Sequence, residues 1–211
     1  MWYTYLIIAI ILLIAELVYF RIADKCNIID KPNDRSSHST IVLRGGGIIF
    51  SLSMIVWAIL MVVQGNAIAP YLPFLCGLVL ICGISFWDDV HSLPDSLRMA
   101  VQIISILLMF WSMGLYTAAD SWLWTAVIVV VALFFCVGAT NIINFMDGIN
   151  GITAAYSFAM LFPILLLNRN MGFIEESYLI VAILGLLVFS IFNFRPKGRR
   201  NVLQGMWGVS A

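Results

Sequence analysis

The stretch WLWTAVIVVVALFFCVGATNII, residues 122–143, contains no charged residue. A helix needs about 20 apolar residues to cross the hydrocarbon of a bilayer, because each residue adds about 1.5 Å of rise. The rest of the chain agrees, since 63% of the 211 residues are hydrophobic and 10% are charged, with a mean hydropathy of +1.03. A soluble globular domain, in which about a quarter of the residues are charged, is excluded.

Seven stretches have the length and hydropathy of membrane spans, and they predict an all-α, polytopic transmembrane helix bundle. The first is expected to remain as an anchor rather than to be a cleaved signal peptide, because Glu16 interrupts it and no basic residue precedes it. The seven predicted spans cover residues 3–20, 46–63, 70–87, 97–115, 122–143, 152–167 and 178–194.

Basic residues are distributed unevenly between the two sides of these spans. Helices alternate in direction, so the loops after the odd-numbered spans share one side, and they hold ten of the eleven basic residues, with Arg169 on the other side. Cytoplasmic loops carry the excess of Lys and Arg, which predicts that the N-terminus lies outside. The net charge of zero gives no indication of a nucleic-acid partner.

Polar side chains at the ends of the spans fall on this predicted cytoplasmic side. Asp88 and Asp89 end the third span, and Asn141, Asn144 and Asp147 end the fifth. Carboxylates at a membrane boundary are costly unless they are paired, hydrated or bound to a cation, so they are candidates for function. The loop after the first span adds polar and basic candidates, namely Lys31, Asn33, Arg35, His38 and Arg44.

These oxygen-rich groups favour a hard divalent cation. Carboxylates without a His or Cys cluster point to Mg²⁺, with Mn²⁺ as the alternative, and such ions often complete their shell with substrate phosphates. Arg35 and Arg44 could bind phosphate oxygens, and His38 could donate or shuttle a proton. The sequence therefore predicts phosphoryl chemistry at the cytoplasmic boundary.

Each group also has a simpler structural interpretation. The neighbouring Asp88 and Asp89 could cap a helix end or start a turn, and the asparagines of the fifth span could join helices by hydrogen bonds. Arg98 and Gln102 are four residues apart on the fourth span and could line the same cavity. They could equally be an interfacial arginine and a hydrogen-bonded glutamine.

Three motifs resemble those of the polyprenyl-phosphate N-acetylhexosamine-1-phosphate transferases, an integral membrane family also called glycosyltransferase family 4. They are D-x-P-N-x-R-x-x-H at residues 30–38, the Asp-Asp pair with the following Leu93, and NIINFMDGING at residues 141–151. The branch that these motifs resemble is the undecaprenyl-phosphate N-acetylglucosamine-1-phosphate transferases.

The resemblance implies a multi-pass enzyme of the bacterial inner membrane with a cytoplasmic active site. It implies transfer of an N-acetylhexosamine 1-phosphate, GlcNAc-1-phosphate by branch, from a UDP-N-acetylhexosamine to undecaprenyl phosphate with release of UMP, as the first membrane step of cell-wall or surface-polysaccharide synthesis. Mg²⁺ would be required. A homodimer is left open. The implied catalytic residues are Asp88, Asp89 and Asp147, of which Asp89 and Asp147 would bind the metal. The implied substrate-binding residues are Lys31, Asn33, Arg35, His38, Arg44, Arg98, Asn141, Asn144 and Asn150.

The sequence departs from this family at three places. Arg98 stands where a lysine is common, and Asn150 stands where many relatives have a second aspartate. Residues 1–197 are expected to be the N-terminal part of the transferase domain, whereas residues 198–211 lack the G-D-x-G-S segment expected next. An out-of-frame or divergent tail is therefore the hypothesis for 198–211. The alternatives to an active enzyme are an inactive truncated fragment and a transporter.

Overall fold

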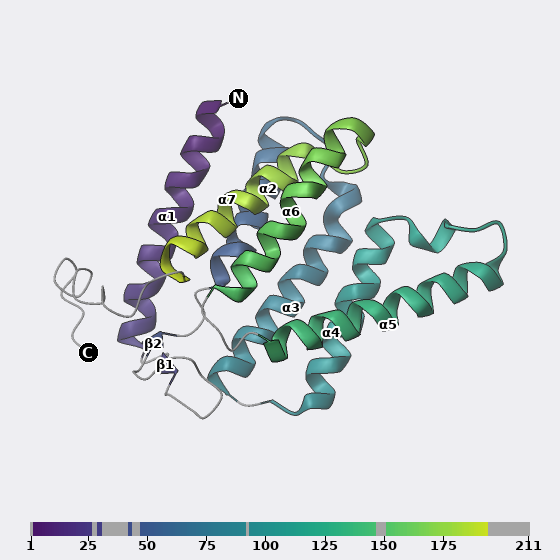
Figure 1. The fold of residues 1–211 in the computed structure, drawn as a ribbon, viewed down its shortest axis with the longest axis horizontal. Coiled ribbons are helices and arrows are strands. Elements are labelled where there is room, and N and C mark those ends of the chain that lie inside the picture. Colours follow the sequence, from purple (N-terminus) through teal and green to yellow (C-terminus); the bar gives the residue numbers. More distant parts are fainter. Residues whose placement is uncertain are drawn as a thin grey trace. The chain divides into compact units, whose positions relative to one another are not determined.

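In the computed structural model, seven apolar helices make up most of the described residues, and each overlaps one of the predicted spans (Figure 1). The structure describes residues 2–26, 29–30, 42–43, 47–91, 93–146 and 151–193, without the side chains of 29, 30, 42, 43, 89, 90 and 193. The helices are α1 (Trp2–Lys25), α2 (Ile48–Val63), α3 (Leu72–Val90), α4 (Asp95–Ser112), α5 (Trp122–Met146), α6 (Ile152–Met171) and α7 (Glu176–Asn193).

Short elements connect some of these helices. The 3₁₀ helices η1 (Ala69–Tyr71) and η2 (Leu115–Thr117) precede α3 and follow α4. The two-residue strands β1 (Ile29–Asp30) and β2 (Val42–Leu43) pair antiparallel, with Ile29 opposite Leu43. The prediction of an all-α membrane fold is confirmed, since the strands contribute only these four residues among those described.

Within the described part of the chain, five helical segments are long and apolar enough to cross a membrane. They are α1, residues 69–88 of η1 and α3, α4, α5 and α6, while α2 and residues 176–192 of α7 are shorter apolar helices. The number of spans and the side on which the N-terminus lies therefore stay predictions.

The helices form two compact units, and the chain passes between them within α2 and again at the last residue of α5. One unit contains residues 1–54 and 146–211, and the other contains residues 55–145. The second unit consists of the C-terminal part of α2 followed by α3, α4 and most of α5.

In the first unit, α1 packs against α7, and α6 also packs against α7. The buried positions of α1 follow a helical repeat and include Leu12, Glu16 and Tyr19, so one face of this helix lies inside the protein. The rings of Phe20 and Phe192 meet edge to face with their centroids 5.0 Å apart.

Two glycines set the ends of α6. Gly151 at its beginning has φ 90° and Gly172 at its end has φ 61°, a left-handed conformation that glycine adopts without a Cβ clash. The chain then returns as α7 after a short loop. Asn168 holds that loop, because its amide donates to the carbonyl oxygen of Ile174 at 2.8 Å and accepts from the Ile174 N–H at 2.9 Å.

In the second unit, α3 and α4 form the most extensive helix pair of the described chain. Gly77 lets them approach closely, since a Cβ added there would lie 2.7 Å from the backbone carbonyl oxygen of Ser105. At the other end of the hairpin, the Ser112 hydroxyl donates to the carbonyl oxygen of Pro70 at 2.6 Å. These contacts position the turn between α3 and α4, where the candidate site lies.

Candidate active site

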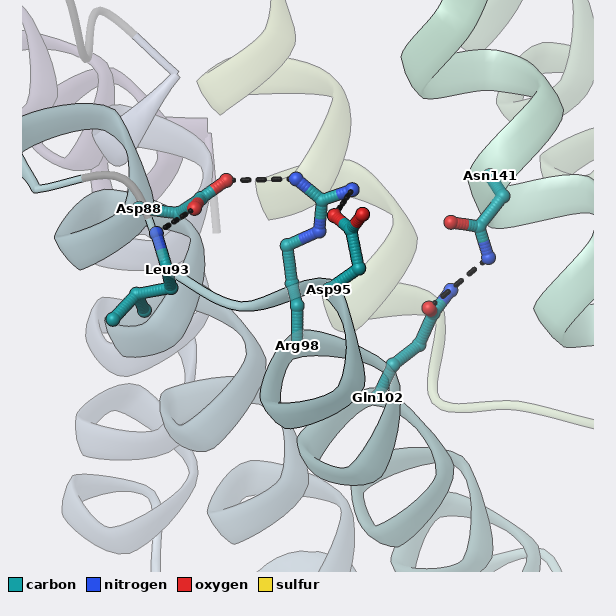
Figure 2. Close-up of polar contacts among 6 residues, drawn as sticks. All are labelled: Asp88, Leu93, Asp95, Arg98, Gln102 and Asn141. Atoms are coloured by element: carbon teal, nitrogen blue, oxygen red, sulfur yellow. Dashed lines mark hydrogen bonds and ion pairs between the residues drawn. The ribbon is translucent and has the colours of Figure 1, made fainter.

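The turn from α3 to α4 is built around the carboxylate of Asp88. Asp88 lies in the last turn of α3, where a negative charge meets the negative end of the helix dipole and needs compensation. Its Oδ1 accepts a hydrogen bond from the Leu93 backbone N–H at 2.9 Å. Its Oδ2 lies 2.8 Å from Nη1 of Arg98 on α4 (Figure 2). One carboxylate therefore fixes the turn and ties the two helices together.

The ion pair between Asp88 and Arg98 is partly shielded from its surroundings. The two side chains are 21% and 33% exposed, so this contact is stronger than a pair on an open surface. Asp95, in the first turn of α4, lies 3.5 Å from Arg98 Nη2 but is 89% exposed, and it contributes less. The guanidinium has five N–H groups, and those that these carboxylates do not use can bind a further anion such as a phosphate.

A second polar contact lies one helical turn further along α4. Asn141 of α5 donates from Nδ2 to Oε1 of Gln102 at 3.1 Å (Figure 2). The same Nδ2 also donates to the carbonyl oxygen of Val137 at 2.8 Å. Gln102 is 6% exposed, and its Nε2 has no hydrogen-bond partner among the described residues. The asparagine thus joins two helices, which is one of the two roles that the sequence left open for it.

The structure describes part of the predicted site. It brings Asp88 and Arg98 together, places Asn141 against Gln102, and leaves the Asn144 side chain exposed on α5. The backbone of Asp89 lies within α3, but its side chain is outside the described part. The remaining predicted residues lie wholly outside the described residues: Lys31, Asn33, Arg35, His38, Arg44, Asp147 and Asn150.

Some partners at the site were not predicted from sequence. The Leu93 N–H is a backbone group, and no side-chain pattern could reveal its bond to Asp88. The contact of Asp95 with Arg98 could have been found, since acidic and basic residues three apart on a helix are neighbours. Gln102 was identified as a cavity candidate, whereas its pairing with Asn141 depends on how α4 and α5 meet.

A metal site cannot be assembled from the described residues alone. Among them, no group of three or more His, Cys, Asp or Glu side chains could hold an ion. Both oxygens of Asp88 already have hydrogen-bond donors, and a ligated cation would compete with Arg98 for that carboxylate. The expected metal ligands Asp89 and Asp147 have side chains outside the described part.

A surface hollow of the second unit lies at the opposite end of α4, away from Asp88. Its volume is about 550 Å³, and it is open to the surroundings. It contains none of the predicted site residues and no charged side chain, so we assign no chemistry to it. Its lining consists of Tyr116, Thr117, Ala119, Trp122, Thr125, Ala126 and Val129.

Comparison with known proteins places the chain in a family. Residues 71–205, more than half of the chain, match the family model described as glycosyl transferase family 4. The chain is also 25% identical over 185 residues to a protein of Bacillus subtilis (strain 168) described as "Probable undecaprenyl-phosphate N-acetylglucosaminyl 1-phosphate transferase". The alignment covers 83% of this chain and 51% of the relative, so the chain spans about half the length of that protein. No solved structure matches the chain.

Proposed function

The chain belongs to glycosyl transferase family 4, and from this premise we propose that it acts in transferring a sugar 1-phosphate to a polyprenyl phosphate in a membrane. The finer proposal is transfer of N-acetylglucosamine 1-phosphate from its UDP-sugar to undecaprenyl phosphate. The printed description of the Bacillus subtilis relative supports this choice of sugar and lipid. The observation that carries the proposal is the Asp88–Arg98 pair, which lies within the family match at the ends of two apolar helices.

The proposed reaction exchanges one phosphoric anhydride bond for another. An oxygen of the lipid phosphate attacks the phosphorus that carries the sugar, a new P–O–P bond forms, and the bond to the departing UMP breaks. Negative charge on the phosphate oxygens must be neutralised throughout, which is a task for positively charged groups close to the reacting atoms.

Arg98 is the described residue that fits this task. Its guanidinium is held by Asp88, and its free N–H groups offer the planar geometry that phosphate oxygens accept. Because both oxygens of Asp88 are occupied, we favour positioning of Arg98 over direct proton abstraction as the role of Asp88. The arginine, in place of the lysine common in the family, keeps the charge and adds donors.

Further proposed roles belong to the other predicted site residues, most of whose side chains lie outside the described part of the chain. We propose Mg²⁺ as the cofactor, held by Asp89 and Asp147, because hard divalent ions prefer carboxylate oxygens. The metal would supply charge neutralisation at the phosphates when bound. Lys31, Asn33, Arg35, His38, Arg44, Asn144 and Asn150 are proposed to contact substrate. The excess of basic residues on the odd-numbered loops supports a cytoplasmic active site in a bacterial inner membrane.

Membranes that contain the 211-residue chain, given radiolabelled UDP-N-acetylglucosamine and undecaprenyl phosphate, test the proposal. We expect a labelled lipid product, and we expect Arg98→Leu to lower its rate at least about ten-fold, because a hydrogen bond to a charged group contributes about 1.5–3 kcal/mol. Arg169→Leu is the control, since Arg169 also forms an arginine–carboxylate pair, with Glu176 at 3.0 Å, although both of those side chains are more exposed.

Each outcome decides a separate part of the proposal. Equal losses in the two arginine variants would contradict the assigned role of Arg98. No product from the unmodified chain would contradict its activity as an enzyme and would favour the inactive fragment.

A further inference from the structure

The side-chain amide of Asn141 is fixed in one orientation. An asparagine amide has two N–H donors and one carbonyl acceptor. In the structure, Nδ2 of Asn141 donates to Gln102 Oε1 at 3.1 Å and to the Val137 carbonyl oxygen at 2.8 Å. Both N–H groups are therefore used within the protein, and Oδ1 is the part of the amide left to meet a ligand.

Of the two residues in this contact, Gln102 is the one held in place by packing of its helix. It is 6% exposed on α4, whereas none of the described side chains of α5 is buried. Among the described residues, the Asn141–Gln102 bond is the hydrogen bond that joins the side chains of these two helices. Together with the Val137 carbonyl oxygen, the packed helix α4 thus holds the orientation of a side chain on a helix that has little packing of its own.

From this arrangement, we propose that Gln102 is a positioning residue that turns Asn141 into an acceptor-only contact for substrate. This inference rests on the proposed function and deepens it. Asn141 Oδ1 would accept a hydrogen bond from a hydroxyl or N–H group of the sugar nucleotide. Phosphate oxygens are themselves acceptors, so Asn141 would not bind them, and that task falls to Arg98 one turn away on α4.

The division of labour has a chemical consequence. Arg98 presents donors and binds anions, while Asn141 presents an acceptor and discriminates between substrates by their donor groups. Loss of Gln102 would leave the Val137 carbonyl oxygen as the one described partner of the amide, so the amide would rotate more easily. This would weaken the discrimination without removing the phosphate contact. A merely structural glutamine would instead lower stability and leave the preference for donor groups unchanged.

The orientation of the amide can be measured without any enzymatic activity. The full 211-residue chain, labelled with ¹⁵N-asparagine in detergent micelles, gives side-chain amide signals whose exchange with deuterium is followed by NMR; Asn141→Ala identifies the signal of interest. We expect Gln102→Leu to accelerate exchange of the Asn141 amide about five-fold or more, the effect of losing one hydrogen bond. Gln102→Glu retains an acceptor oxygen and should restore slow exchange.

Two internal controls keep this test decisive. Ser105 lies three residues further along α4 and is 5% exposed, with a hydroxyl that has no partner among the described residues, so Ser105→Ala should leave the Asn141 signal unchanged. The amide of Asn168, bonded to Ile174 in the other unit, reports whether a variant has folded. Unchanged Asn141 exchange in a folded Gln102→Leu variant would overturn the proposal.

A kinetic arm separates this inference from the proposed function. In the membrane assay, Gln102→Leu should raise KM for the UDP-sugar more than it lowers kcat, and Gln102→Glu should restore KM. A fall in kcat with an unchanged KM for the UDP-sugar would refute the positioning role. If the unmodified chain forms no lipid product, the proposed function fails and this inference about substrate fails with it. Slow amide exchange would still show that Gln102 orients Asn141.

Discussion

Replacing Glu16 with leucine is expected to stabilise the protein. Glu16 lies on the buried face of α1 and is 0% exposed, and neither of its carboxyl oxygens has a hydrogen-bond partner among the described residues. A buried polar group left unsatisfied costs about 1–3 kcal/mol, so two such oxygens cost about 2 kcal/mol or more. Leucine has a similar volume and carries no polar atom.

The expected gain is therefore about 2 kcal/mol in the free energy of unfolding, the lower bound of that cost. Reversible unfolding of the purified chain by a titration of sodium dodecyl sulfate in mixed micelles measures it. Asp24→Leu is the matched control, because Asp24 is an exposed acid near the end of the same helix, and its replacement removes no buried, unpaired carboxyl group. Glu16→Gln keeps a polar side chain of the same length and should gain less than leucine.

A loss of stability in Glu16→Leu, beyond that of Glu16→Gln, would refute this reasoning. It would mean that the carboxyl group has a partner in the folded protein that outweighs the cost of burying it. The comparison of the two variants also separates charge from polarity, since glutamine keeps the outline and the polar end of the acid, whereas leucine removes the polar end.

Three further substitutions test the packing of the helices in the same unfolding experiment. Gly77→Ala should destabilise the α3–α4 pair by about 1–3 kcal/mol, because the new Cβ would lie 2.7 Å from the carbonyl oxygen of Ser105. Gly185→Ala should have an effect of the same order, because its Cβ would lie 2.7 Å from the Cβ of Ser53, which is fully buried. Asn168→Ala should cost about 2 kcal/mol, because it removes two hydrogen bonds to the following loop.

Each of these has a control on the same elements. Gly83→Ala adds a methyl group to α3 that would meet no described atom within 4 Å beyond its own stretch of helix. A loss equal to that of Gly77→Ala would therefore contradict the steric argument. Adding Ser53→Gly should restore stability lost in Gly185→Ala, because it removes the side chain that the new methyl group meets. No recovery of stability in the double variant would exclude a clash at that contact. Asn170→Ala removes an exposed asparagine from α6, and it should cost little; a cost as large as that of Asn168→Ala would refute the loop assignment.

The helices were predictable from the sequence because bilayer thickness sets the length of an apolar run. The charge-free residues 122–143 lie within α5, and the prediction that the third span ends near Asp88 and Asp89 is close to the observed end of α3 at Val90. Helix ends were less accurate, since α1 continues to Lys25, five residues beyond the predicted span. A search for apolar runs stops where polar residues begin, so it misses a last helical turn that is polar.

The partners of polar side chains were less predictable, because they depend on how helices pack. The spacing of Arg98 and Gln102 indicated a shared face of α4, but the partners of that face, Asp88 and Asn141, come from two other helices. Burial of Glu16 could not be read from an apolar run in which every position looks alike. The roles expected for the loop from Lys31 to Arg44 stay predictions.

The apolar helices of this chain differ in length. α5 has 25 residues and α2 has 16, which correspond to about 37 Å and about 24 Å along the helix axis. The hydrocarbon of a typical bilayer is about 30 Å thick, so it falls between the two. If both helices cross the bilayer, as the sequence predicts, a thin membrane reduces the length mismatch of α2 and forces α5 to tilt. A thick membrane does the reverse, at a fraction of a kcal/mol for each ångström of mismatch. Under that prediction, a change in the acyl-chain length of the host lipids should act on these two helices in opposite directions.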